Sequence, residues 1–171
     1  MSRQLRGHHL MCALGFRGHG YSPAFAANMA DILAALDRAP ETPVQVVDVP
    51  DGICAAFPAD QPGHCLEADV VERDRRVIAR VGLNVGDVLT WRELRRRLGA
   101  AFSPADLDGL CTTCRWLPLG FCREGLAALQ STSAVDAGKR EMPGASAAGG
   151  PLSAAGAPDA TGAATPRGAP R

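Results

Sequence analysis

The chain has 171 residues, a length typical of one globular domain and long enough to bury a core without help from a metal. Its 18 basic and 18 acidic residues leave no net charge, which argues against a protein whose main role is to coat nucleic acid or an anionic membrane. We interpret the run Arg95-Arg96-Arg97, with Arg92 one turn earlier, as a solvated helix face rather than an anion-binding patch.

The N-terminal segment does not resemble a secretion signal. His8 and His9 open its apolar stretch, and no small-residue cleavage site follows before Arg17. No stretch approaches the length of about 18 apolar residues that a membrane span needs. We therefore expect a cytoplasmic protein with no nucleic-acid or membrane partner. In that reducing compartment its six cysteines are better explained as ligands or nucleophiles than as disulfides.

The first half of the chain contains two helix signals and one strand signal. Ser22-Pro23 is an N-cap followed by a proline at the first helical position, and apolar residues then recur at helical spacing, which predicts a helix over 23–37. The β-branched segment 44–49 lies between two prolines and predicts a strand whose partner we expect within residues 3–12. Apolar periodicity also indicates a helix over 68–81, ended by Gly82.

Three more helices are expected further along. A capping box at Thr90–Glu93 starts one that reaches about Phe102. Ser103-Pro104 repeats the cap-and-proline pattern and predicts a short helix that runs into Cys111, and residues 123–129 suit a last short helix. The predicted fold class is therefore α+β and mainly helical, with a small β element and cysteine-bearing loops.

Composition divides the chain in two. All eight aromatic residues and all six cysteines precede residue 131, and the remainder is rich in Ala, Gly and Pro. Such a segment cannot bury enough apolar surface to offset its chain entropy. We predict a cysteine-rich metal-binding domain over 1–130 and a disordered tail over 131–171.

The strongest chemical signal is Cys111-Thr-Thr-Cys114, followed by Cys122 after a loop that contains a proline and a glycine. Two residues between cysteines let both sulfurs face one metal, and a third cysteine can supply a further ligand. Cys54 and Cys65 lie in another Pro- and Gly-rich segment, where ligands are more common than core thiols. His64 beside Cys65 is a further candidate, or simply a solvated loop histidine.

A third cluster is Arg6-Gly-His8-His9-Leu-Met-Cys12. Either histidine would share a helix face with Cys12, so that either pair could contact a metal. A buried Cys12 beside solvated or capping histidines, and a Cys-His nucleophilic pair, are alternatives that the sequence leaves open.

The number and spacing of the cysteines bear on which metal the protein binds. A structural zinc site usually shows two CxxC-like pairs, and this chain has one. Iron-sulfur clusters often combine one CxxC with remote cysteines, and six thiols exceed the four that zinc would need. These features favour iron-sulfur, although one CxxC is compatible with either metal.

Several motifs together resemble one family. They are Arg6-Gly-His-His-Leu-Met-Cys12, Gly15-Phe-Arg-Gly-His-Gly-Tyr-Ser-Pro23, Asp51-Gly-Ile-Cys54, Cys111-Thr-Thr-Cys114-Arg-Trp116 and Gly120-Phe-Cys122. Over residues 3–127 the chain resembles the domain of unknown function 1284 family of bacteria and archaea. The resemblance implies a protein suggested to bind an iron-sulfur cluster, and it supplies no reaction. The family pattern implies Cys-x-x-Cys-Pro at 54–58, so Phe57 stands where a cysteine is expected.

The sequence thus predicts an iron-sulfur protein that transfers electrons or senses redox state, with a redox protein as a possible partner. Cys111, Cys114 and Cys122 are the expected ligands, with Cys54 or Cys65 completing the shell and Cys12 as the sixth candidate. One alternative is a zinc-stabilised interaction module. The other is a metal-dependent enzyme that uses His8, His9 and Cys12 at an open coordination position.

Overall fold

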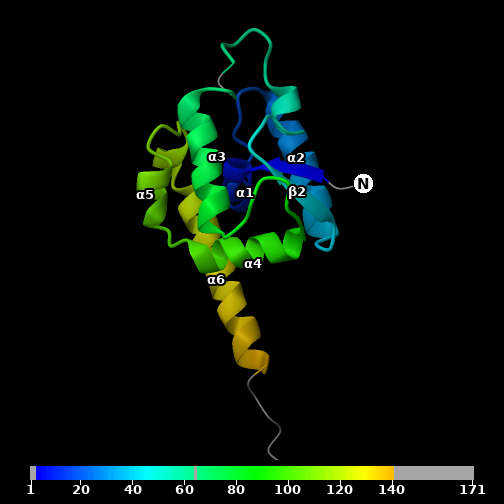
Figure 1. The fold of residues 1–171 in the computed structure, drawn as a ribbon, viewed down its shortest axis with the longest axis vertical. Coiled ribbons are helices and arrows are strands. Elements are labelled where there is room, and N and C mark those ends of the chain that lie inside the picture. The colour runs from blue at the N-terminus through cyan, green and yellow to red at the C-terminus, as the bar shows by residue number, and fades with distance from the viewer. Residues whose placement is uncertain (1–2, 64, 141–171) are drawn as a thin grey trace, which may run out of the picture. The chain divides into compact units, whose positions relative to one another are not determined.

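The computed structural model describes residues 3–63 and 65–140, with side chains as far as residue 132. It confirms a mainly helical α+β fold (Figure 1). The elements in chain order are β1 (Arg3–Arg6), α1 (Gly7–Gly15), α2 (Pro23–Arg38), β2 (Pro43–Val47), α3 (Ala68–Arg80), β3 (Val88–Thr90), α4 (Trp91–Ala101), α5 (Asp106–Leu110) and α6 (Phe121–Arg140), with single 3₁₀ turns η1 (Cys54–Ala56) and η2 (Leu117–Leu119).

The three strands form one small sheet in the order β1-β2-β3. β1 runs parallel to β2, with Arg3 opposite Val44 and Arg6 opposite Val47, which confirms that the predicted strand finds its partner near the N-terminus. β3, which the sequence analysis did not predict, pairs antiparallel to the other edge of β2. Val44 and Val46 are fully buried, so the sheet contributes one face to the core.

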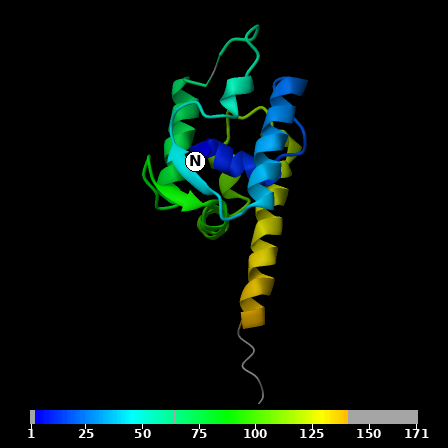
Figure 2. The same ribbon diagram turned by 90° about the vertical axis from the view of Figure 1, so that its right-hand side faces the viewer.

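Helix α1 is the central element, and it was not predicted as a helix. It contacts α3, α4 and α6, and its Leu10 and Met11 are almost completely buried (Figures 1 and 2). The side chain of Arg6, the residue before α1, does not cap the first turn of this helix. Instead the Asp74 carboxylate on α3 accepts the backbone N–H of His8 at 2.8 Å. This cap comes from a residue 66 positions away, so the sequence near α1 contains no capping signal for it.

Two other helix starts follow their sequence signals. Ser22 Oγ accepts the backbone N–H of Phe25 at 3.1 Å, and Thr90 Oγ1 accepts that of Glu93 at 3.2 Å. α3 ends at Arg80, close to the predicted boundary. Phe25, Met29, Leu33 and Leu36 form the buried face of α2, as its periodicity predicts.

The last two helices differ from expectation. Ser103 does not cap α5, because its N–H and hydroxyl both donate to the Asp106 carboxylate, and the helix begins only at Asp106. α6 begins at Phe121 and continues to Arg140, beyond the expected end at residue 129. Residues 131–140 of the predicted tail are therefore helical, and residues 141–171 lie outside the described part.

Among the described residues, none of the helices combines the length and the apolar character that crossing a membrane would require.

Candidate metal centre

One cavity collects the residues that the sequence analysis singled out. It has a volume of about 390 Å³, and all six cysteines line it, together with His8, His9 and His19. Its wall is formed by α1 and the segment that follows it, α2, the segment 54–67, α3, the segment 110–119 and the start of α6. Cys12 and Cys122, which are 110 positions apart in the sequence, thus line the same cavity. His64 lies outside the described residues.

Four thiols form a group within this cavity: Cys12, Cys111, Cys114 and Cys122. The Cys12 and Cys122 thiols share a hydrogen bond, which raises the pKa of Cys12 and lowers that of Cys122, whereas burial acts to raise both. Cys111 and Cys114 are near enough to raise the pKa of Cys12 further by charge repulsion. Burial raises the pKa of Cys111 to about 11, and Cys114 adds to that effect. Four cysteines that line one cavity are a candidate set of ligands, which would bind a metal as thiolates.

A close helix crossing holds Cys12 beside Cys122. A Cβ added to Gly15 would overlap the backbone of Cys122, and one added to Gly125 would overlap the carbonyl of Leu14. α1 and α6 therefore touch backbone to backbone, at a distance that only glycine permits. The same crossing fixes one wall of the cavity.

The Cys111–Cys114 pair sits in a tight turn. The Cys114 N–H donates to the Cys111 carbonyl at 2.8 Å, and the Leu117 N–H donates to the Cys114 carbonyl at 3.1 Å. These bonds place the pair just after α5, where Leu107 and Leu110 anchor the segment in the core. The sequence predicted this turn correctly from two-residue spacing alone.

Cys54 and Cys65 have other neighbours. Burial raises the pKa of Cys54 to about 12, and the negative charge of Asp51 and the thiol of Cys65 act in the same direction. Arg6 Nη1 lies 3.7 Å from Cys54 Sγ. Cys54 thus belongs to a separate group, here called the N-terminal cluster, whose members are Arg6, His8, His9, Asp51, Cys54 and Asp74. Cys12 instead joins Cys111, Cys114 and Cys122.

Sequence reasoning missed two carboxylates that hold the histidines. Asp51 lies 2.8 Å from His9 Nδ1, and Asp74 lies 2.8 Å from His8 Nδ1. Ligand atoms of His9, Asp51 and Cys54 lie within 4.8 Å of one another, so this group has the composition of a metal site. Asp74 had a detectable signal, because it lies four residues after Val70 and three before Val77, on the apolar face of α3.

Charge and burial set the state of these groups. Burial lowers the pKa of His8 to about 4, despite its bond to Asp74, so the imidazole is neutral at physiological pH. His9 and backbone N–H groups hold the pKa of Asp51 at about 2, against the opposing effect of burial. A neutral imidazole and an ionised carboxylate are the forms found around metal ions.

An aromatic wall closes another side of the cavity. The Tyr21 ring lies 4.7 Å from both Phe57 and Trp116 and 5.1 Å from Phe25, measured between ring centroids. The Arg115 guanidinium stands over Tyr21, 5.5 Å from its centroid. Phe57, where the family resemblance implies a cysteine, contributes its ring to this wall. Its position is therefore apolar packing in this chain.

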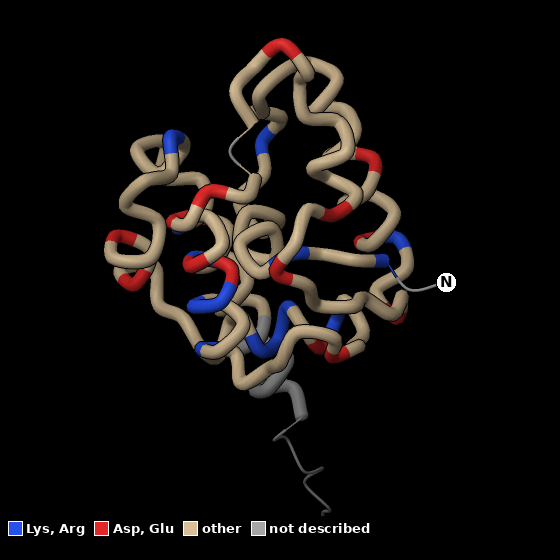
Figure 3. The backbone as a smooth tube through the Cα atoms, turned by 45° about the horizontal axis from the view of Figure 1, so that its top comes forward, with Lys and Arg blue, Asp and Glu red and all other residues tan. Residues whose placement is uncertain are grey.

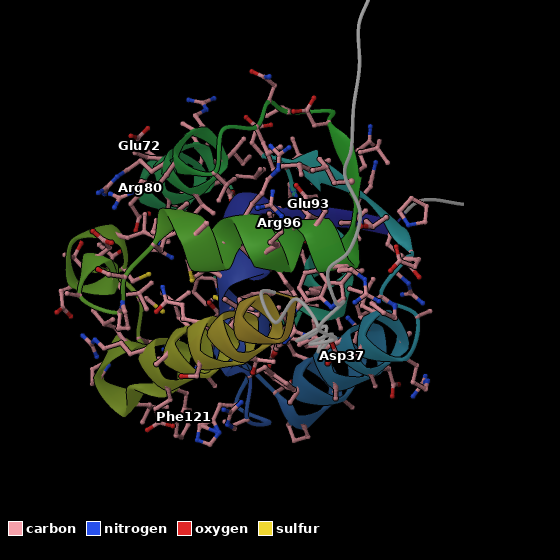
Figure 4. All side chains as sticks on the ribbon, turned by 90° about the horizontal axis from the view of Figure 1, so that it is seen from below. Asp37, Glu72, Arg80, Glu93, Arg96 and Phe121 are labelled. Atoms are coloured by element: carbon pink, nitrogen blue, oxygen red, sulfur yellow. The ribbon has the colours of Figure 1, made fainter. Side chains whose placement is uncertain are left out.

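The arginine run lies on α4 and is paired with acids. Arg96 pairs with Glu93 (Figure 4). Arg97 also pairs with Glu93, Arg95 with Asp37 and Arg92 with Glu41. Acidic and basic residues are interspersed over the visible backbone of the described residues (Figure 3). Exposure and ion pairing of these arginines agree with the interpretation as a solvated helix face.

Comparison with known proteins gives one result. No curated protein and no solved structure matches this chain. The family model described as a protein of unknown function, DUF1284, matches residues 20–120, which is more than half of the chain and includes four of the six cysteines. The chain belongs to the DUF1284 family.

Proposed function

We propose that this protein binds an iron-sulfur cluster through Cys12, Cys111, Cys114 and Cys122, and that it transfers electrons or senses redox state. The observation that carries the proposal is the convergence of these four thiols, from three separate segments, on one cavity. The sequence analysis favoured Cys54 or Cys65 as the fourth ligand. We favour Cys12 instead, because its thiol is hydrogen-bonded to the thiol of Cys122.

Sulfur spacing supports a cluster over a single zinc ion. Tetrahedral zinc with Zn–S bonds of about 2.3 Å brings its sulfurs to about 3.8 Å from one another. Among the described residues, no three cysteine sulfurs lie within 4.8 Å of one another. A cluster tolerates the wider spacing, because its inorganic core fills the space between thiolates.

The surroundings suit a group that carries negative charge. Arg17 lowers the pKa of Cys122, and Arg73 and Arg76 act in the same direction on Cys111. These cations offset thiolate charge that would otherwise be costly in a buried site. The cluster, when bound, supplies one-electron chemistry, and the aromatic wall around Tyr21 limits the access of water to it, which influences its potential.

Metal content and colour test the proposal. Protein purified without oxygen is expected to contain iron and acid-labile sulfide and to absorb visible light. Cys114→Ser and Cys12→Ser should each bleach that absorption and lower the melting temperature, because binding energy in such a site is also folding energy. Cys65→Ser is the matched control and should keep both iron and sulfide.

Two results would contradict the proposal. A colourless protein with stoichiometric zinc would identify a zinc-stabilised module. Retention of full iron and sulfide in Cys12→Ser, with loss of both in Cys54→Ser, would move the site to the N-terminal cluster.

A further inference from the structure

One part of the N-terminal cluster has the spacing of a metal site. Among the described residues, the only three histidine, cysteine or carboxylate ligand atoms within 4.8 Å of one another belong to His9, Asp51 and Cys54. In a tetrahedral zinc site, nitrogen, oxygen and sulfur ligands lie about 3.4–3.6 Å from one another. The distance criterion that argues against zinc at the cysteines is therefore met by this three-ligand group, to which His8 does not belong.

Asp51 and Cys54 are held in one turn. Asp51 Oδ1 accepts the backbone N–H of Ile53 at 2.9 Å and that of Cys54 at 3.2 Å, which fixes the carboxylate relative to the cysteine. Two residues separate Asp51 from Cys54, the same spacing that lets both cysteines of a CxxC pair face one metal. These two ligands are therefore already arranged side by side.

The other oxygen of Asp51 faces His9. Asp51 Oδ2 accepts the Arg6 backbone N–H at 2.9 Å and contacts His9 Nδ1 at 2.8 Å. An ionised carboxylate only accepts, so in the metal-free protein the proton of Nδ1 lies between these two atoms. A metal ion can take the place of that proton if the two atoms separate to about 3.4 Å. The imidazole proton then moves to Nε2, and His9 stays neutral.

The charges of the group suit a divalent cation. Asp51 and His9 are buried, and Cys54 is half-buried. Burial and the negative charge of Asp51 raise the pKa of the Cys54 thiol to about 12, so without a cation this thiol keeps its proton. A divalent ion balances one carboxylate and one thiolate, which leaves no net charge in a region where an unbalanced charge is costly.

The surroundings also suit a metal ligand shell. Arg6 is neutralised by Asp74, and its Nη1 lies 3.7 Å from Cys54 Sγ, where it can donate to a metal-bound thiolate. His9 and Cys54 both line the cavity. A metal held by three protein ligands at such a wall keeps a fourth position for water or substrate, as catalytic zinc sites do.

We propose that His9 Nδ1, Asp51 Oδ2 and Cys54 Sγ bind a single divalent ion of the zinc class, with water from the cavity as its fourth ligand. One nitrogen, one oxygen and one sulfur suit borderline ions such as Zn²⁺ and Co²⁺, whereas Mg²⁺ and Ca²⁺ prefer oxygen alone. Binding releases the Cys54 thiol proton. The ion lowers the pKa of its water toward about 7, so the site supplies a hydroxide at neutral pH. It is separate from the four-thiol group and does not depend on what that group binds.

Cobalt is a suitable probe, because bound Co²⁺ can be counted per chain. It is titrated without oxygen into the full chain, into His9→Asn and into His8→Asn. Asparagine places its amide nitrogen where Nδ1 stands, so it keeps a donor for the carboxylate but offers no imidazole to the metal. We expect His9→Asn to bind one equivalent less than the unaltered chain.

His8→Asn is the matched control. Nδ1 of His8 also contacts a buried carboxylate, that of Asp74 at 2.8 Å, and its ring lines the same cavity. His8 is nevertheless outside the three-ligand group. This variant should therefore bind as much cobalt as the unaltered chain.

A second pair of variants tests the sulfur ligand without altering either histidine. Cys54→Ala should also bind one equivalent less, whereas Cys65→Ala, which removes another thiol that lines the cavity, should bind as much as the unaltered chain. All four variants keep the four-thiol group, so whatever that group binds is the same in each sample. Iron and sulfide should not change in any of them, and a chain without iron should give the same differences in cobalt.

Three results would overturn the inference. One is equal cobalt in His9→Asn and His8→Asn, whether both lose an equivalent or neither does. Another is equal cobalt in Cys54→Ala and Cys65→Ala. The third is a loss of iron and sulfide together with cobalt in Cys54→Ala, which would assign this cysteine to the cluster.

Discussion

Asp74 is a completely buried carboxylate that joins α3 to β1 and to α1. It neutralises Arg6, caps α1 through the His8 N–H and orients the His8 ring. Asp74→Asn replaces one acceptor oxygen with an NH₂ group that faces donors, and it leaves the Arg6 charge buried without an ionised partner. The loss of one member of a buried ion pair costs about 3–5 kcal/mol. We expect a loss of that order in the free energy of unfolding, measured by urea denaturation.

Glu72→Gln provides the comparison for that experiment. Glu72 lies on the same helix but is exposed, and its side chain points outward (Figure 4). Exposed substitutions of this kind change stability by about 0.5 kcal/mol or less. If both variants lost the same small amount, the Asp74 network would not contribute to stability as its geometry implies.

At the scale of the helix, the crossing of α1 and α6 depends on Gly125. In Gly125→Ala the new Cβ would overlap the Leu14 carbonyl, and backbone cannot move aside as a flexible side chain can. We expect destabilisation of about 1–3 kcal/mol, which is typical of overpacking, and a weaker link between Cys12 and Cys122. Thermal unfolding measures the first effect, and metal retention measures the second.

Gly109→Ala is the matched control for the crossing. Gly109 lies within α5, and no atom lies within 4 Å of a Cβ added there. Alanine is favoured over glycine in a helix by about 1 kcal/mol, so this variant should be as stable as the unaltered chain or more so. A destabilised Gly109→Ala together with a neutral Gly125→Ala would contradict the close approach of α1 and α6.

The first turn of α4 provides a pH-dependent test. Bonds from Arg96 and Arg97 lower the pKa of Glu93 to about 2, from an ordinary value of 4.5. Because the folded-state pKa is the lower one, the stabilisation is complete above pH 4.5 and disappears as the pH falls toward 2. The pair is solvent-exposed, so we expect only about 0.5 kcal/mol. The melting temperatures of Glu93→Gln and the unaltered chain should differ at pH 7 and converge near pH 2.

Over the whole molecule, the sequence predicted elements whose signals are local. The Ser22 cap, the Thr90 cap and the β2 strand depend on neighbours within a few residues, and all three are confirmed. α1 was missed because its cap comes from Asp74, which is distant in sequence. The extension of α6 was missed because its composition after Leu129 resembles a linker.

The candidate site likewise combines features that have a local sequence signal with features that depend on residues distant in sequence. Two-residue spacing indicated the turn that carries Cys111 and Cys114, whereas the pairing of Cys12 with Cys122 follows from a helix crossing that only the fold reveals. Asp51 and Asp74 are common residue types, and their role appears only when the histidines are placed beside them. The spacing of cysteines along the chain can indicate candidate ligands that share a turn. It cannot indicate candidates from distant segments that line the same cavity.

The last prediction concerns the C-terminal part of the chain. Gln130 Nε2 donates to the carbonyls of Gly99 and Phe102, at 2.9 and 2.7 Å, and Leu129 packs on Gly99. These contacts join α6 to the end of α4. A chain that ends at Gln130 keeps them, and composition after that residue offers no aromatic side chain and no cysteine, so this chain should retain its metal and its melting temperature.

A chain that ends at Ala128 loses the two Gln130 hydrogen bonds and the Leu129 contact. It leaves the Gly99 and Phe102 carbonyls without the Gln130 donor and removes the apolar cover of Gly99. We expect a loss of about 1–3 kcal/mol, the usual effect of removing a partner from such groups. Thermal unfolding of the full chain and the two shorter chains decides the matter. If ending at Gln130 already lowered the melting temperature as much as ending at Ala128, the later residues would belong to the domain, and its predicted boundary at residue 130 would be wrong.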